Sequence, residues 1–338
     1  MIQYKFQELF FFLILFFHEI VVLVCFCRMR LPLLLSPLSV SGSLELPLVF
    51  AGEGPTTLAV VGVATDASTA FERVWLSFSD GCSIDTVPGS YRFVDRVFCL
   101  RTHNATQNFT YHDCPYLTEI HDADDASNPY VGAVQLGIGP GSPIMNFGGS
   151  VDILPRRLIL GQSHEEFEQQ FCLPGTLLSV PYSLDTTGAG RHLRITPNTT
   201  YVVQYPFLEA SVSWAITGLS IVNDRFIGFE VPETLYSDLV DVINIESPYW
   251  DDTDIFPTFA SCERVRNTLP TVSLVFEEYG QLVLYPEDYT EMVDADQCIL
   301  YVMPGPINGS MRFNPLRLTD FNIRLTETNL TFCDSLSL

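Results

Sequence analysis

One stretch of the sequence, residues 219–243, constrains the fold more than any other. The apolar run Leu219–Val222 has the composition of a buried strand and ends abruptly in Asn-Asp-Arg at 223–225. A second apolar run covers Phe226–Val231, and Pro232 then precedes apolar residues at helical spacing. Because proline is favoured at the first position of a helix, the stretch predicts strand, loop, strand and helix in that order.

Size and charge limit the class of protein. The chain has 338 residues, of which 47% are hydrophobic, so it can bury one large core or two lobes, and two lobes are expected. Its formal net charge is −23, with only 17 lysines and arginines. A nucleic-acid partner is not expected, because neutralising phosphates requires clustered cations. The acidity is that of a solvated surface, and adaptation to an acidic lumen is the alternative.

Sequons and cysteines favour the secretory pathway, in an extracellular, lysosomal or vacuolar setting. The five Asn-x-Ser/Thr sequons begin at Asn104, Asn108, Asn198, Asn308 and Asn329. Of nine cysteines, two lie in the N-terminal apolar run and seven follow it. Seven is an odd number, so one thiol is free or pairs with another chain.

The N-terminal region, residues 1–43, is predicted to be a signal or anchor. Phe10–Cys27 is almost wholly apolar and long enough to span a membrane. However, arginines follow it, and basic residues after a span tend to stay in the cytoplasm, which would keep the rest of the chain out of the lumen. Translation from Met29 would instead give a short basic end, an apolar core and small residues for cleavage. A cleaved signal is favoured, and a membrane is a partner only if the segment is retained as an anchor.

From Leu44 onward the pattern is that of an all-β protein. Short apolar runs are broken by Gly, Pro, Asp and Ser, as in Leu58–Ala64, which predicts a buried strand followed by a turn. Late in the chain, 269–276 and 281–289 predict a hairpin with alternating apolar residues. Phe321–Leu325 and Leu330–Cys333 predict a closing hairpin.

These patterns resemble the pepsin-like aspartic peptidases, in which an apolar strand runs into Asp-Thr/Ser-Gly at each of two loops. The spacing to Pro232 puts Asn223 where the second catalytic Asp would stand. Asp66 is the candidate for the first, since Trp75 and Cys82 match the residues that follow it in the family. The resemblance covers about residues 44–335. It implies a bilobal fold of two β-barrel-like lobes with short helices, with an N-terminal lobe at 44–176 and a C-terminal lobe at 177–338.

The resemblance implies further assignments. Cys262 and Cys298 bracket the predicted hairpin at the positions of a family disulfide, and Tyr91 is the candidate for the tyrosine of the flap that covers the substrate. The glycine-rich segment Gly132–Ile144 resembles a strand buried between sheets. It is not expected to bind phosphate, because no lysine follows and no helix is expected to open. No metal site is predicted, since the acidic run at 122–125 lacks the spaced ligands of a calcium loop.

The active site departs from the family. Catalysis needs two carboxylates that share one proton, and the amide of Asn223 cannot take part. If Asp224 served as the second acid in place of Asn223, the neighbouring Arg225 would favour the state in which both carboxylates are ionised, which is unproductive. Ser68 and Arg225 also stand where the family has glycine. The sequence therefore predicts a non-catalytic glycoprotein without cofactor, whose cleft binds an extended peptide or protein segment. Two alternatives stay open, an active endopeptidase with the displaced pair Asp66 and Asp224, and a structural surface glycoprotein.

Overall fold

The computed structural model describes residues 43–50, 58–60, 63–64, 74–84, 89–101, 106–120, 134–155, 157–185, 192–207, 211–222, 228–246, 249–251, 258–294, 297–305, 309–315, 318 and 320–336. The predicted signal or anchor at the N-terminus lies outside these residues. No helix within the described ranges is long and apolar enough to cross a membrane.

Strands dominate both halves of the chain, as predicted. The first half comprises β1 (Leu44–Phe50), β2 (Leu58–Val60), β3 (Val63–Ala64), β4 (Val74–Ser77), β5 (Ser83–Ile84), β6 (Gly89–Arg101), β7 (Thr106–Ile120), β8 (Val134–Gly137), α2 (Pro143–Gly148), β9 (Ser150–Leu154), β10 (Arg157–Leu160) and α3 (His164–Phe171).

The second half begins with β11 (Leu178–Asp185), β12 (His192–Ile195), β13 (Thr199–Gln204), β14 (Val212–Ile216), β15 (Gly218–Ile221), β16 (Phe229–Val231), α4 (Glu233–Glu246), β17 (Tyr249–Asp251), β18 (Thr258–Ala260) and α5 (Cys262–Thr268). It continues with β19 (Thr271–Phe276), β20 (Gly280–Leu284), η2 (Pro286–Asp288), β21 (Thr290–Asp294), β22 (Gln297–Leu300), β23 (Val302–Pro304), β24 (Ser310–Phe313), β25 (Phe321–Thr326) and β26 (Asn329–Asp334).

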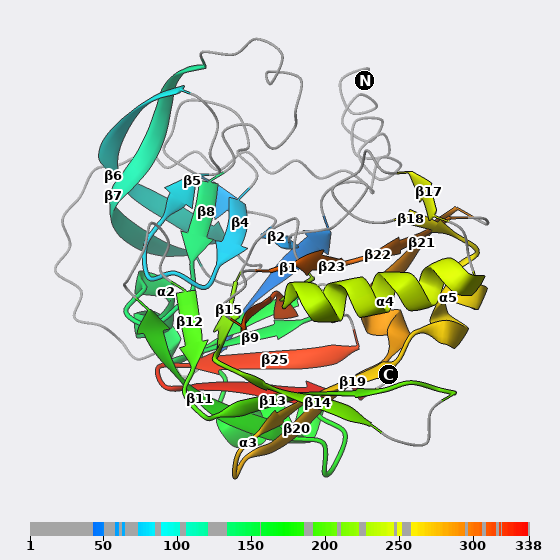
Figure 1. The fold of residues 1–338 in the computed structure, drawn as a ribbon. Coiled ribbons are helices and arrows are strands. Elements are labelled where there is room, and N and C mark those ends of the chain that lie inside the picture. The colour runs from blue at the N-terminus through cyan, green and yellow to red at the C-terminus, as the bar shows by residue number, and fades with distance from the viewer. Residues whose placement is uncertain are drawn as a thin grey trace, which may run out of the picture.

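A central antiparallel layer joins the two halves in the strand order β11-β26-β25-β9-β10-β1 (Figure 1). The junction is the pair β9 and β25, where Ile153 lies opposite Ile323. Every residue of β9 is buried, because the strand lies within the sheet and both of its faces are covered. The two halves thus share one continuous sheet rather than a flexible linker.

The central layer continues at both ends into the strands of the two lobes. The first part of β1 pairs with β10 and its last residues pair with β2, and β11 pairs in the same way with β26 and then β12. The extended sheet ends in β2-β4-β8-β5 on one side and in β12-β15-β24-β16-β23 on the other. Within the described residues the sheets are open.

The alternating patterns place the predicted hairpins correctly. β19 alternates half-buried and buried residues along its whole length and pairs with β20 across the turn from Phe276 to Gly280. β25 and β26 form the closing hairpin, and helix α4 follows β16 after Pro232 as the spacing predicted. The alternation of apolar and polar residues and the position of Pro232, which are both local features of the sequence, were therefore sufficient to predict these elements.

The glycine-rich segment needs one correction. β8 is a strand as expected, and its residues Leu136 and Gly137 are buried. However, a six-residue helix, α2, does open at Pro143, contrary to the expectation that no helix follows. Ser142 caps it by accepting a hydrogen bond from the Met145 backbone N–H, and Pro143 occupies the first turn. The sequence signal for the helix was this Ser-Pro pair.

Three disulfides link described residues, namely Cys82–Cys114, Cys172–Cys333 and Cys262–Cys298. The predicted bridge from Cys262 to Cys298 is confirmed. Cys172–Cys333 joins the end of α3 in the first half to β26 in the second, so it is a covalent link between the halves. The seventh cysteine after the apolar run, Cys99, belongs to β6. This set of bridges is typical of a protein of the secretory pathway.

Replacing Gly137 by alanine should destabilise the fold. A Cβ at Gly137 would lie 2.2 Å from the backbone oxygen of Gly81, and backbone cannot move aside cheaply. We expect a loss of about 1 to 3 kcal/mol in the free energy of unfolding, measured by urea denaturation. Gly81→Ala is the matched control, since a Cβ there meets nothing within 4 Å, and equal losses in both variants would contradict this account.

Candidate functional site

The second predicted loop connects β15 to β16, and the strand β24, which comes later in the chain, lies between these two in the sheet. β24 pairs in parallel with β15 and antiparallel with β16, so β15 and β16 are not direct neighbours. The Val222 N–H donates to the Phe313 carbonyl at 2.9 Å, and the Asn314 N–H donates to the Gly228 carbonyl at 3.0 Å. Both ends of the intervening loop are therefore fixed. The loop residues Asn223, Asp224 and Arg225 themselves lie outside the described residues.

An aromatic cluster packs against the strands β16 and β24 of this frame. The rings of Phe229 and Phe313 stack with centroids 4.8 Å apart, and Tyr289 meets Phe229 edge to face at 6.3 Å. All three are buried, and burial raises the pKa of Tyr289 well above its usual value. Gly228 is required at the start of β16, because a Cβ there would lie 2.6 Å from the Tyr301 carbonyl oxygen. The cluster gives the loop a rigid base.

An ion pair lies on the other face of the same strands. Glu230 and Arg312 are directly opposite each other on β16 and β24, with carboxylate and guanidinium 3.2 Å apart. The Arg312 side chain is half exposed, so the pair is worth at most about 1 kcal/mol.

The first predicted loop is framed in a comparable way. It connects β3 to β4, and β8 pairs in parallel with β4, with the Ile138 N–H donating to the Ser77 carbonyl at 2.8 Å. The Tyr111 hydroxyl donates to the Gly137 carbonyl at 2.6 Å, which ties β7 to β8. Asp66 belongs to the connection between Ala64 and Val74 and lies outside the described residues. The catalytic assignment of Asp66 and Asp224 stays a prediction.

The long hairpin β6–β7 adjoins the first loop at a place that the sequence did not indicate. β3 pairs with β6 at Leu100 and Cys99, close to the hairpin turn. Tyr91 lies opposite Leu117 near the other end of β6, roughly 30 Å away along an extended strand. The flap assignment of Tyr91 stays a prediction.

A predicted glycosylation site shares this end of the hairpin. Ala64, Cys99 and Asn108 form one cross-strand row through β3, β6 and β7, which puts Asn108 roughly 10 Å from β3. Asn108 and Thr110 are exposed, whereas Phe109 between them is buried against Phe147 of α2. A glycan at Asn108 would therefore begin beside the strand that leads to Asp66.

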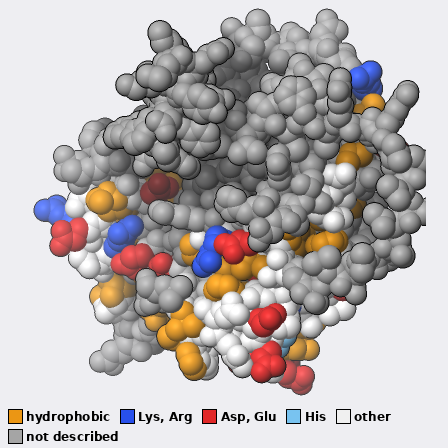
Figure 2. Space-filling view, turned by 180° about the vertical axis from the view of Figure 1, so that it is seen from behind, with side chains coloured by type: hydrophobic (Ala, Val, Ile, Leu, Met, Phe, Trp, Pro, Cys, Tyr) orange, Lys and Arg blue, Asp and Glu red, His pale blue; other side chains and the backbone are white. Residues whose placement is uncertain are grey.

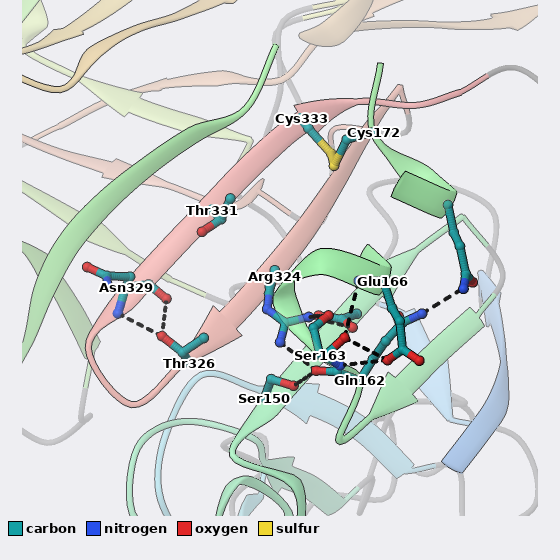
Figure 3. Close-up of polar contacts among 12 residues, drawn as sticks. Ser150, Gln162, Ser163, Glu166, Cys172, Arg324, Thr326, Asn329, Thr331 and Cys333 are labelled. Carbon is teal, nitrogen blue, oxygen red and sulfur yellow. Dashed lines mark hydrogen bonds and ion pairs between the residues drawn. A yellow bond between two sulfur atoms is a disulfide. The ribbon is translucent and has the colours of Figure 1, made fainter. Parts of the chain in front are cut away.

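The junction between the halves holds a buried polar network (Figure 3). Arg324 of β25 lies directly opposite Asp152 of β9, and its Nη1 donates to both carboxylate oxygens, at 2.9 and 3.1 Å. Its two terminal nitrogens also donate to the carbonyls of Ser163 and Gln162, at 3.2 and 2.6 Å. The guanidinium carbon lies 5.4 Å from the ring centre of Phe167. A residue of the second half is thus held almost entirely by groups of the first.

The start of α3 presents these groups to Arg324. The Ser163 hydroxyl accepts from the Glu166 N–H at 3.2 Å, and a Glu166 carboxylate oxygen accepts from the Ser163 N–H at 3.0 Å. This capping box fixes the chain at Gln162 and Ser163 so that their carbonyls point at Arg324 (Figure 3). The Ser150 hydroxyl donates to the Gln162 carbonyl at 3.0 Å and orients it further.

No metal site is formed by the described residues, since no group of three or more His, Cys, Asp and Glu side chains converges there. On the face in Figure 2, the described acidic and basic side chains are interspersed, and no described basic patch is present.

The comparisons with known proteins concern the fold. The sequence matches no protein-family model and no curated protein. In structure the chain is a bilobal, all-β protein of the pepsin-like type. Among solved structures it is similar to basic 7S globulin from soybean, with a TM-score of 0.55 and 12% identity over 87% of this chain and 96% of that one.

Two further solved structures show the same similarity. Conglutin gamma, a basic 7S globulin from lupine seeds, gives a TM-score of 0.57 and 9% identity over 86% of this chain and 94% of its own. The protein edgp gives 0.54 and 10% over 87% and 95%. At these identities the likeness establishes the fold alone, and it does so over almost the whole length of each neighbour.

The ionisation of Asp152 should make stability depend on pH. Burial raises the pKa of this carboxyl to about 7, and Arg324 offsets only part of that rise. The folded chain therefore binds the proton more tightly than the unfolded chain, so this group contributes most to stability below about pH 4, and its contribution falls as the pH rises to 7. In urea unfolding across this range, wild type should lose a few kcal/mol relative to Asp152→Asn, since one pKa unit is about 1.4 kcal/mol.

Asp152→Asn keeps the shape of the side chain but removes its titration, so the difference between the two proteins isolates this group. A difference that stays constant, or that grows in favour of wild type as the pH rises, would show that Arg324 keeps the carboxylate ionised throughout.

Proposed function

We propose that this chain is a non-catalytic glycoprotein of the secretory pathway, extracellular or luminal, that binds an extended peptide segment in the cleft between its lobes. The observation that supports the proposal is the strand frame β15-β24-β16 on either side of the second loop. The sequence of that loop has Asn-Asp-Arg at 223–225, where the family pattern has Asp-Thr/Ser-Gly. An amide neither accepts nor releases a proton near neutrality, so the shared-proton chemistry has only one acid.

The neighbours in structure fit this proposal. Two of the three carry the name basic 7S globulin, which is not the name of a peptidase. This chain differs from those two in its charge, because its formal net charge is −23. A shared fold with opposite charge indicates a different ligand, and an acidic protein favours peptides that carry arginine or lysine through long-range attraction.

A proteolysis assay separates the proposal from the active-enzyme alternative. The full chain, incubated with unfolded globin at about pH 4, should give no cleavage that pepstatin blocks, since loss of one acid typically costs about 10²- to 10⁴-fold in rate. Asp66→Asn should leave any background unchanged. Cleavage that pepstatin blocks, and that Asp66→Asn and Asp224→Asn each abolish, would establish the endopeptidase instead.

Peptide binding should depend on the glycan at Asn108. We expect Asn108→Gln to raise the association rate of a basic, extended peptide measured by surface plasmon resonance, because removing the glycan uncovers the side of β3. Asn198→Gln is the matched control, since Asn198 is exposed next to Glu277 at the end of a different sheet. If no peptide binds to any variant, the structural-glycoprotein alternative is supported; equal rates in the two variants would contradict only the shielding by Asn108.

A further inference from the structure

The two halves of the central sheet are built on equivalent hairpins. Leu154 and Arg157 flank the two-residue turn between β9 and β10, and Thr326 and Asn329 flank the two-residue turn between β25 and β26. Superposing the two turns relates each half to the other by an internal twofold axis. The strands that lie outside the hairpins obey the same relation, because β1 pairs with β10 as β11 pairs with β26.

Four pairs of residues related by this axis are apolar on both sides, namely Val151 and Ile323, Ile153 and Leu325, Leu158 and Leu330, and Leu160 and Phe332. Other related pairs differ in polarity, as Ile159 does from Thr331. Within these strands, Asp152 and Arg324 are the related pair of opposite charge. Since these two residues are also paired directly across β9 and β25, the axis passes through the ion pair itself.

This symmetry creates an alternative partner for each half. If β9 of one copy met β9 of a second copy, the backbone hydrogen bonds would be kept and apolar residues would again face apolar residues. Above the raised pKa of Asp152, about 7, a buried Asp152 carboxylate would then face a second one. In the same way, β25 against β25 would oppose two Arg324 side chains, neither of which would reach the carbonyls of Gln162 and Ser163 or the ring of Phe167.

We propose that the Asp152–Arg324 pair selects the partner of each half-sheet, so that β9 accepts β25 of the same fold and rejects β9 of a second copy. The pair has the required properties. Asp152 is fully inaccessible to solvent and the Arg324 side chain is 5% exposed, so opposing like charges could not be screened by water. Leaving one buried charge without its partner costs about 3 to 5 kcal/mol.

Stability alone does not account for the pair. A buried ion pair is often no more stable than well-packed apolar residues of similar volume, and determining register is the best-attested use of such groups. Arg324 Nε and Gln162 Oε1 are buried without a hydrogen-bond partner within the described structure, which adds to the cost.

Oxidative refolding of the full chain tests the inference. Wild type and Asp152→Leu/Arg324→Met are refolded from denaturant over a range of concentrations and analysed by light scattering and by mass-spectrometric mapping of disulfides. Wild type should give monomer with Cys172–Cys333. The double variant should fold, with dimers and larger species that increase with concentration to several times the wild-type fraction, and with less intrachain Cys172–Cys333.

Two further variants complete the experiment. Glu230→Leu/Arg312→Met removes an ion pair of the same sheet that lies within one half, so it should refold as wild type does. Asp152→Asn/Arg324→Gln keeps the shape of the pair without its charge and should give the same dimers as the apolar variant. The inference is overturned if both neutral pairs refold to monomer as cleanly as wild type, or if neither folds at any concentration.

Discussion

The pairing of β9 with β25 is the constraint on which the rest of the structure depends. It joins two half-sheets into one layer, and the buried contact between Asp152 and Arg324 lies at its centre. Because Arg324 also binds carbonyls at the start of α3, the register of the strands and the position of that helix are fixed together. The disulfide Cys172–Cys333 then closes the same junction covalently at the other end of α3.

From this layer each lobe extends through strands that change partners midway, and each lobe delivers one loop. The ends of the second loop are held by β24, and the strand that follows the first loop is held by β8, in both cases through backbone hydrogen bonds. Such a frame is indifferent to the side chains within the loop. A chain can therefore keep the pepsin-like architecture while its loops lose catalytic residues, which is why fold and function are separate questions for this protein.

The sequence predicted those elements whose cause is local. The alternation of apolar and polar residues predicted the hairpins β19–β20 and β25–β26, and Pro232 predicted the start of α4. The resemblance to the family predicted the disulfide Cys262–Cys298. The sequence did not predict elements that are too short for a periodic pattern, or contacts between residues that are distant in the chain. Helix α2 has only six residues, too few for a periodic signal, and its Ser-Pro start was overlooked. The meeting of β3 with the far end of β6 depends on pairings that no local pattern carries.

By itself, the sequence determined the all-β class and the order of the late strands, because alternation and turn chemistry are local properties. Only the tertiary structure decided that Asp152 faces Arg324, that Cys172 reaches Cys333 and that Asn108 lies in one cross-strand row with Ala64 of β3, across β6. These partners are distant in the chain, and their association follows from the strand register of the assembled sheet, which is a property of the whole fold.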